Sequence, residues 1–273
     1  MEQILVCLTG VVNRSIKYTW HSINDNLVSE LNKKFNVDIA IFNNNVEDCK
    51  VDGVLLNNND MSVVPYKYLF EYKQSFITEE VQKIKFYEKN GSDRWEGNEK
   101  LNGFRQMYID SKIIDLLEKH SNKYKYVLVT NADYFYVNKF STENLKLINN
   151  NSLLTCYQID FGGITDGFYM AKPDVIKKIL NRINYYDKLI HEINNRYNYE
   201  IILNKSIVIN NIERIKIDLF FLKLRANCKW KHLHEKKPIF KNQIIPFLKK
   251  YLQENKDKYP EYNYLCNIRM EAT

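Results

Sequence analysis

The chain has 273 residues, a length typical of one large domain or of two small ones. Hydrophobic residues make up 45% and aromatic residues 14% of the sequence, which excludes a wholly disordered protein. The formal net charge of +7 suits an anionic ligand, but the basic residues are spread along the chain, whereas nucleic-acid-binding proteins typically carry a dense basic face. The five cysteines are widely spaced and form no Cys-x-x-Cys pair, which argues against zinc and against a disulfide framework.

The amino-terminal part has the pattern of an open α/β sheet. Residues 4–8 form a short apolar run that ends at Thr9-Gly10 and predicts a buried parallel strand. Apolar residues at helical spacing predict a helix over residues 19–35, and a second strand is expected over residues 37–42. Residues 43–60 are rich in Asn and Asp and predict a long loop.

The middle of the chain continues with helices and further strands. A helix is expected over residues 79–89, and the broad apolar face of residues 103–120 predicts a stronger one. Residues 124–130 are the clearest strand, with an apolar centre that is typical of burial on both faces. Shorter strands are expected over residues 153–157 and 168–171.

The last third of the chain is mixed. A helix is predicted over residues 173–183, because a proline stands at its first position, and another over residues 187–197. Residues 201–212 and 215–224 are apolar and partly β-rich. Residues 243–252 have the pattern of an amphipathic helix.

These elements predict an α/β fold with a mixed, mainly parallel central sheet flanked by helices. We expect one domain over residues 1–235 and a helical C-terminal extension over residues 236–273 that packs on it. No stretch approaches eighteen apolar residues, and the first segment is typical of a strand rather than of a signal peptide. We therefore expect a chain without a membrane span, located in the cytoplasm.

Two carboxylates stand at positions typical of ligand binding. Asp133 follows the strand over residues 124–130 in Asn131-Ala132-Asp133, and open α/β sheets bind ligands beyond the carboxyl ends of their strands. A carboxylate there can hold a divalent ion that bridges a diphosphate, or it can simply cap a turn. Asp166 lies in a Gly-Gly-Ile-Thr-Asp-Gly loop, where it can bind hydroxyl groups or act as a general base, or again serve the turn alone.

Basic residues supply further candidates. Arg14 follows the first strand, a usual place for a phosphate contact, and Lys100 and Arg105 precede the Asp133 strand. Each of these cations has a plain alternative as a solvated surface residue. His232 and His234 alternate and would share one face of a strand, where they could complete a metal site. No Gly-x-x-x-x-Gly-Lys-Ser and no Gly-x-Gly-x-x-Gly pattern is present, which argues against a kinase and a Rossmann dehydrogenase.

Three blocks of sequence together carry a resemblance to a known family. The blocks are Val6-Cys7-Leu8-Thr9-Gly10 with Arg14-Ser15, Thr19, Ser22-Ile23 and Asn26-Leu27; Arg105-Gln106-Met107-Tyr108 with Tyr126 to Asp133; and Gly162 to Phe168 with Lys172-Pro173. In their order and spacing over residues 4–225 they resemble the GT-A-fold glycosyltransferases, including small ones encoded by large DNA viruses. The resemblance implies transfer of a sugar, as a hexosyl or deoxyhexosyl group, from a nucleotide-sugar donor, commonly a UDP-sugar, to a glycan or protein-linked acceptor, assisted by Mn²⁺ or Mg²⁺.

The resemblance also implies roles for individual residues. The nucleotide-binding residues would be Thr9, Gly10, Arg14, Arg105, Asn131, Ala132 and Asp133. The acceptor side would use Gly163, Thr165 and Asp166, with Asp166 as the catalytic residue of an inverting enzyme. The metal ligands would be Asp133, Asn131 and His234. One departure is that Asn131 stands where the family's DxD-like motif has an acid, which predicts weaker metal binding because an amide brings no charge.

Two other functions stay open from the sequence. The substitution at Asn131 is compatible with a catalytically inactive relative that binds nucleotide without turnover. The basic stretch over residues 229–241 is compatible with a nucleic-acid-associated protein. The donor sugar, the acceptor, the stereochemical course and the oligomeric state are not encoded in any short motif.

Overall fold

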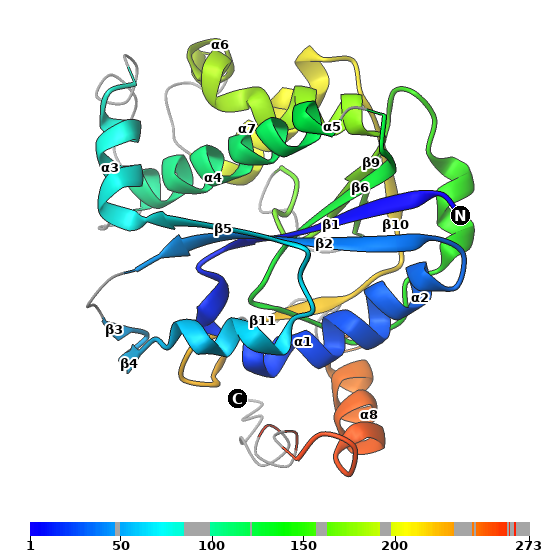
Figure 1. Ribbon diagram of the computed structural model, residues 1–273. Helices are drawn as coiled ribbons and strands as arrows, with labels where there is room; N and C mark the ends of the chain where they lie inside the picture. The colour runs from blue at the N-terminus through cyan, green and yellow to red at the C-terminus, as the bar shows by residue number, and fades with distance from the viewer. Residues whose placement is uncertain are drawn as a thin grey trace.

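The computed structural model describes residues 1–46, 50–84, 99–120, 122–156, 163–191, 198–231, 242, 244–260, 262 and 265. A seven-stranded sheet forms the centre of the molecule (Figure 1). Its strands, in spatial order, are β10 (Glu213–Ile217), β8 (Ser152–Cys156), β9 (Tyr169–Ala171), β6 (Tyr124–Asn131), β1 (Gln3–Gly10), β2 (Asn36–Asn45) and β5 (Tyr68–Lys73). Only β9 runs antiparallel to its neighbours. The predicted mixed, mainly parallel sheet is therefore confirmed.

Helices cover both faces of this sheet. One face carries α3 (Gln74–Gln82), α4 (Glu99–Lys119), α5 (Pro173–Leu180), η5 (Asn181–Tyr185), α6 (Tyr186–His191) and α7 (Tyr199–Ile209). The other face carries η1 (Val12–Arg14), α1 (Ile16–Ile23), the π-helix η2 (Asn24–Val28), α2 (Ser29–Asn32), η3 (Asn58–Val63) and η4 (Thr142–Leu147). Successive side chains of β1 point to opposite faces, so Leu5 and Cys7 join one core whereas Ile4, Val6 and Leu8 join the other. Both faces are apolar for that reason, as the sequence predicts.

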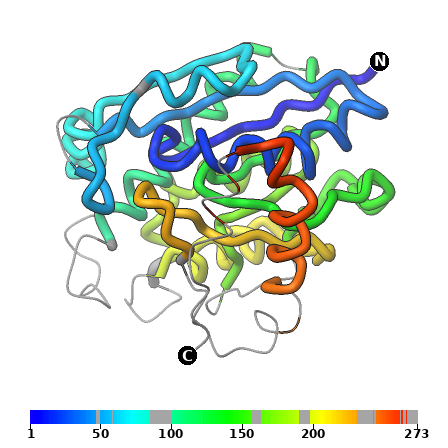
Figure 2. Tube along the Cα trace, turned by 90° about the horizontal axis from the view of Figure 1, so that it is seen from below, coloured from blue at the N-terminus to red at the C-terminus, as the bar shows by residue number. Residues whose placement is uncertain are grey.

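A smaller sheet extends one side of the molecule. It consists of β7 (Tyr134–Tyr136), β11 (Phe221–Leu224) and β12 (Trp230–Lys231), and the two-residue strands β3 (Lys50–Val51) and β4 (Val54–Leu55) form a separate hairpin. Helix α8 (Ile245–Asn255) packs beside the smaller sheet, with the rings of Phe135 and Tyr251 5.6 Å apart. Figure 2 shows the carboxyl-terminal segment crossing the side of α1, where Tyr259 stacks on His21 at 3.9 Å. The described part of the predicted extension thus packs on the rest, while its boundary at residue 235 stays a prediction because residues 232–241 lie outside the described part.

The structure changes several predicted elements. The prediction of a long loop over residues 43–60 is wrong in part, because β2 continues to Asn45 and is followed by the β3–β4 hairpin and η3. Residues 199–209 form a helix, so the β-rich part of that stretch begins only at Glu213. The helix expected at 79–89 is α3, which begins five residues earlier; residues 85–98 and 192–197 lie outside the described part. Within the described part, no helix is long and apolar enough to cross a membrane.

Candidate functional site

The carboxyl ends of the two central strands, β1 and β6, meet at one edge of the sheet. Thr9 of β1 pairs with Asn131 of β6 in the parallel ladder, so the polar residues that end both strands lie side by side. Gly10 has a φ of 95°, a left-handed conformation that side chains other than glycine rarely adopt, and it turns the chain into η1. That turn carries Arg14 back toward Asp133, which follows β6 after one residue. Two segments that are far apart in the sequence therefore form one site, as expected for an open α/β sheet.

Cations surround the buried carboxylate of Asp133. Arg14 Nη1 lies 3.2 Å and Lys223 Nζ 3.4 Å from Asp133 Oδ2. Burial alone would raise the pKa of Asp133, but the charges of Lys223, Arg14 and Arg225 outweigh it and hold the pKa below its ordinary value. A second carboxylate, that of Asp52 at the tip of the β3–β4 hairpin, lies 3.8 Å from Arg14 Nε and 4.0 Å from Arg225 Nε. The side chains of Arg14, Lys223 and Arg225 keep 19–26% of their surface exposed, so a ligand can reach them.

Beside these cations lies a third carboxylate, that of Asp166, whose two hydrogen-bond donors are uncharged. Asn131 Nδ2 donates to Asp166 Oδ2 at 3.0 Å, and the Tyr134 hydroxyl donates to Asp166 Oδ1 at 2.7 Å. Burial and the adjacent Asp166 raise the pKa of Tyr134 well above its usual value, so the phenol keeps its proton and remains a donor. The Lys223 ammonium lies 5.2 Å from the centre of the Tyr134 ring and connects the two halves of the site.

A buried hydrogen-bond chain connects the site to the helix layer. Thr9 Oγ1 donates to Asn131 Oδ1 at 2.9 Å and accepts from Gln106 Nε2 at 3.2 Å, and the same Gln106 amide donates to Asp110 Oδ1 at 2.8 Å. Asp110 is also paired with Arg182 at 2.5 Å, and both side chains are fully buried. Since the Asn131 oxygen accepts the hydrogen bond from Thr9, the amide is oriented with its NH₂ group toward Asp166.

The structure brings most of the predicted site residues to this edge of the sheet. Thr9, Gly10, Arg14, Asn131, Asp133 and Asp166 lie together there. Ala132 is buried, and its backbone carbonyl accepts a hydrogen bond from Thr19 at 2.6 Å. Some of the predicted residues lie outside the described part of the chain. They are Gly162, His232 and His234, together with most of the basic stretch over residues 229–241.

Three predicted residues lie in positions with a plain packing explanation. Arg105 donates to the Thr78 hydroxyl at 2.8 and 3.0 Å and is held against α3. A Cβ added at Gly163 would come 2.0 Å from the backbone oxygen of Glu200, so this glycine lets the loop touch α7. Thr165 is only 4% exposed. The nucleotide and acceptor contacts that the resemblance implies for them stay predictions.

Sequence reasoning missed four side chains that shape the site. Lys223 and Arg225 stand two residues apart at the end of an apolar strand, and this spacing predicts that their side chains share one face of the strand. It does not predict that they approach Asp133. Gln106 follows the predicted Arg105 by one residue, and Tyr134 follows Asp133. Their roles depend on partners about thirty to one hundred positions away in the chain, which no local pattern reveals.

The two described members of the predicted metal set, Asp133 and Asn131, do not fit a divalent cation. The Asn131 oxygen already accepts from Thr9, and Asp133 Oδ2 is shared by two cations whose charges would repel a metal ion. Among the described residues, no three His, Cys, Asp or Glu side chains gather closely enough to hold a metal. The metal set of Asp133, Asn131 and His234 therefore has no support in the described part of the chain.

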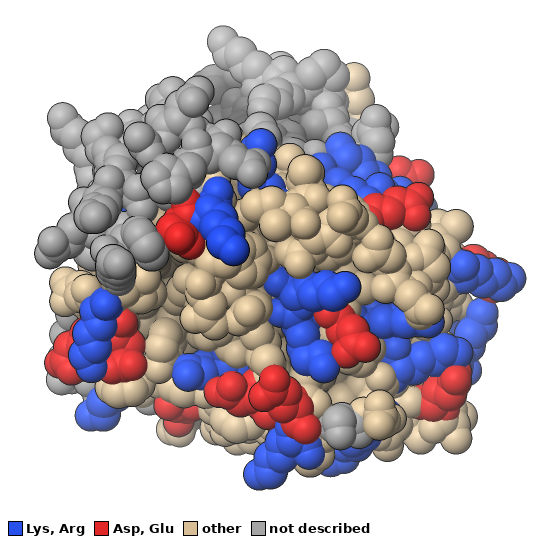
Figure 3. Space-filling view, turned by 90° about the horizontal axis from the view of Figure 1, so that it is seen from above, with Lys and Arg blue, Asp and Glu red and all other residues tan. Residues whose placement is uncertain are grey.

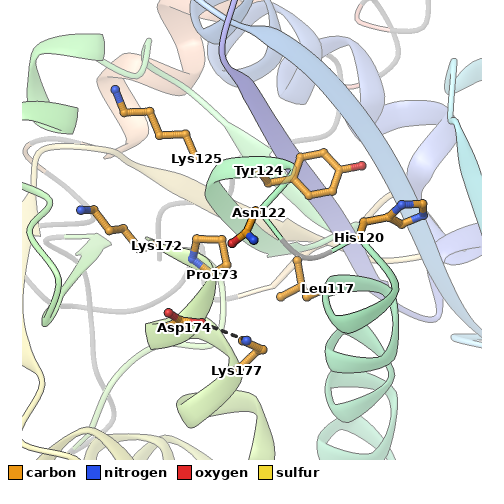
Figure 4. Close-up of a pocket in the computed structure, with 9 residues that line it drawn as sticks. All are labelled: Leu117, His120, Asn122, Tyr124, Lys125, Lys172, Pro173, Asp174 and Lys177. Carbon is orange, nitrogen blue, oxygen red and sulfur yellow. Dashed lines mark ion pairs between the residues drawn. The ribbon is translucent and has the colours of Figure 1, made fainter.

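A separate pocket of about 340 Å³ lies at the opposite end of β6 (Figure 4). It is lined by Tyr124 and Lys125 at the start of that strand and by Lys172, Asp174 and Lys177 around the start of α5. The Lys177 ammonium is paired with Asp174 at 2.9 Å, as the dashed line shows. Because β6 runs from this pocket toward Asn131, the pocket does not belong to the site at the carboxyl edge.

The comparisons with known proteins add little. No protein-family model matches the sequence, and no curated protein matches it significantly. Among solved structures, the apo form of mouse xyloside xylosyltransferase 1 is similar over 80% of this chain and 85% of its own, with a TM-score of 0.43 and 8% identical residues. A TM-score and an identity this low describe a loose similarity of fold and carry no information on activity.

Proposed function

We propose that the chain is a glycosyltransferase that transfers a sugar from a nucleoside diphosphate sugar, such as a UDP-sugar, to an acceptor hydroxyl. The observation that carries the proposal is the arrangement at one sheet edge: a partly exposed carboxylate, Asp166, lies next to the group of cations around Asp133. Cations can bind a diphosphate leaving group, and a nearby carboxylate can accept the proton of the attacking hydroxyl.

The proposed reaction follows from these two halves. The acceptor oxygen attacks the anomeric carbon, its proton passes to Asp166, and the bond from carbon to the diphosphate oxygen breaks with its electron pair on the diphosphate. Asn131 and Tyr134 donate to the two oxygens of Asp166 and so fix the direction of its free lone pairs. A base on the acceptor side implies inversion at the anomeric carbon.

The charges on the face of the molecule that carries α4 and α5 bear on the alternative of a nucleic-acid-binding protein. In Figure 3, the visible part of that face shows Lys and Arg interspersed with Asp and Glu rather than one continuous basic area. A nucleic acid binds most strongly to a continuous basic surface. The described residues that the picture draws on this face therefore give no support for a nucleic-acid-binding surface there.

The test is to measure nucleotide-sugar turnover by the parent protein and by Asp166→Asn. A panel of UDP-, GDP- and dTDP-sugars is incubated with an acceptor glycan mixture, and the released nucleoside diphosphate is quantified. We expect Asp166→Asn to lose about 100-fold or more in rate, since general bases contribute 10²–10⁴-fold, while its nucleotide affinity stays unchanged. The matched control is Asp174→Asn, an 85% exposed aspartate at the opposite end of the sheet, which should leave the rate unchanged.

Two outcomes would contradict the proposal. Turnover in Asp166→Asn equal to that of the parent would remove the proposed base. Nucleotide binding without any turnover in the parent would instead indicate the inactive relative, which the lack of an acid at position 131 makes the second candidate.

A further inference from the structure

Resting on the proposed function, we propose that Arg14, Lys223 and Arg225 neutralise the leaving diphosphate in place of a divalent metal. Asp133 would then serve as the anchor that gathers these cations rather than as a metal ligand. The inference concerns how the substrate's charge is met, which the proposed activity alone leaves open. Three observations carry it.

The first observation is that the two described members of the expected metal set, Asn131 and Asp133, already contact other groups. The Asn131 side chain accepts from Thr9 through its oxygen and donates to Asp166 through its nitrogen. Arg14 and Lys223 both lie within 3.4 Å of Asp133 Oδ2. A metal on Asp133 would have to lie beside these two cations, and repulsion between like charges opposes this.

The second observation is the balance of charge. The three cations are paired with two carboxylates, Asp133 and Asp52, which leaves one net positive charge among these five side chains. The third carboxylate, Asp166, binds the uncharged donors Asn131 and Tyr134 instead. A diphosphate is itself a polyanion with several acceptor oxygens, and guanidinium groups bind such oxygens in pairs. The contacts of Asp52 to Arg14 and Arg225 are long, at 3.8 and 4.0 Å, so phosphate oxygens can replace them at low cost.

The third observation is that the cations are held in fixed places. The Ser15 hydroxyl, next to Arg14, donates to the Leu224 carbonyl at 2.6 Å and connects the η1 turn to β11. The turn after Arg225 is closed by a hydrogen bond from Cys228 N to the Arg225 carbonyl at 2.9 Å. Cations held on short turns bind an anion with less loss of conformational freedom than cations on a mobile loop.

The experiment is calorimetric titration of UDP, GDP, ADP and dTDP into the full chain, once with EDTA and once with Mn²⁺. We expect the dissociation constant of the nucleotide that binds to differ by less than about threefold between the two conditions. Asp133→Asn keeps a side-chain oxygen that can accept from Arg14 and removes a negative charge beside an anion, so it should bind that nucleotide in EDTA as tightly as the parent or more tightly. A metal ligand would behave in the opposite way, since its loss weakens binding.

A second variant keeps the test valid if the buried Asp133→Asn protein does not fold. Arg225→Gln alters a 26% exposed side chain and should weaken nucleotide binding about tenfold and flatten its dependence on salt. Its matched control is Lys250→Gln on α8, which is 71% exposed and should change neither quantity.

The outcomes separate this inference from the proposed function. Binding that requires Mn²⁺, or an unchanged affinity in Arg225→Gln, overturns the inference and leaves a metal-assisted transferase. Absence of binding for every nucleotide in both conditions overturns the proposed function, and the inference falls with it.

Discussion

The fully buried ion pair between Arg182 and Asp110 is connected to the site through Gln106, which donates to Asp110 and to Thr9. Removing either charge tests how much this pair contributes to the free energy of unfolding. Asp110 Oδ2 accepts from Arg182 at 2.5 Å and from Tyr199 at 2.9 Å, and Asp110 Oδ1 accepts from Gln106 at 2.8 Å. In Arg182→Met the carboxylate keeps the hydrogen bonds from Gln106 and Tyr199. In Asp110→Asn the Arg182 guanidinium keeps its charge and loses its counter-charge. Its remaining partners are neutral, and one of them is the Ile179 carbonyl at 3.2 Å.

The expected magnitudes follow from this difference. Breaking a buried pair costs about 3–5 kcal/mol of unfolding free energy, because the remaining charge has no counter-charge. We expect Asp110→Asn at the upper end of that range and Arg182→Met at the lower end, since a carboxylate can bind a proton whereas a guanidinium cannot lose one. The combined variant should cost less than the sum of the two, because it removes both charges.

Urea unfolding followed by circular dichroism measures these free energies. The surface pair of Lys250 and Glu254, whose side chains are 71% and 60% exposed, is the control, and Lys250→Met should cost less than about 1 kcal/mol. Losses below about 1 kcal/mol in both buried variants, or strict additivity in the combined one, would refute the view that Asp110 and Arg182 form one charge-compensated unit.

Three further predictions concern the loop, the motif and the far end of the sheet. Gly163→Ala places a methyl group 2.0 Å from the Glu200 backbone oxygen, so we expect a loss above about 2 kcal/mol in urea unfolding; a loss below that would mean that the loop can move away from α7. Asn131→Asp places a second carboxylate against Asp166, so it should destabilise the protein at pH 7 and less at pH 4, as followed by melting temperature; equal effects at both pH values would contradict this. Burial raises the pKa of Asp38, but hydrogen bonds from two lysines and a tyrosine outweigh it and hold the pKa below its ordinary value. The stability that Asp38 contributes relative to Asp38→Asn is therefore present above about pH 4 and is lost as the pH falls through the folded-state pKa. Urea unfolding of both proteins from pH 7 to pH 2 measures this difference in stability, and a difference that grows toward acid would refute the prediction.

The sheet could be predicted because its strands carry the signal in their own residues. The apolar runs that became β1 and β6 are short, continuous and flanked by polar residues, a pattern that few other elements share. Residues 199–209 show the limit of this reasoning. This helix is apolar on nearly all sides and rich in isoleucine, so neither its period nor its composition separates it from a strand.

Only those site residues that are marked by their neighbours in the sequence could be predicted. Asp133 and Asp166 were found because each stands beside a strand end or a glycine, which are features of a few neighbouring residues. Lys223 shares the Asp133 carboxylate with Arg14, and Arg225 shares the Asp52 carboxylate with it, although both lie about 210 positions from Arg14 in the chain. A hydrogen bond from Ser15 to the Leu224 carbonyl connects the η1 turn to β11 there. That contact depends on how the smaller sheet folds back, and no pattern near residue 223 encodes it.

The same long-range contacts explain the amide in the motif. A carboxylate at position 131 could not donate to Asp166, and it would add a negative charge within 3.0 Å of one. Asn131 therefore allows Asp166 to stay beside the strand end, while Lys223 and Arg14 supply positive charge next to Asp133. The amide at position 131 and the cations around Asp133 are then two parts of one electrostatic arrangement. It follows that an acid placed at position 131 is not expected to create a metal site by itself, because the cations that contact Asp133 would remain.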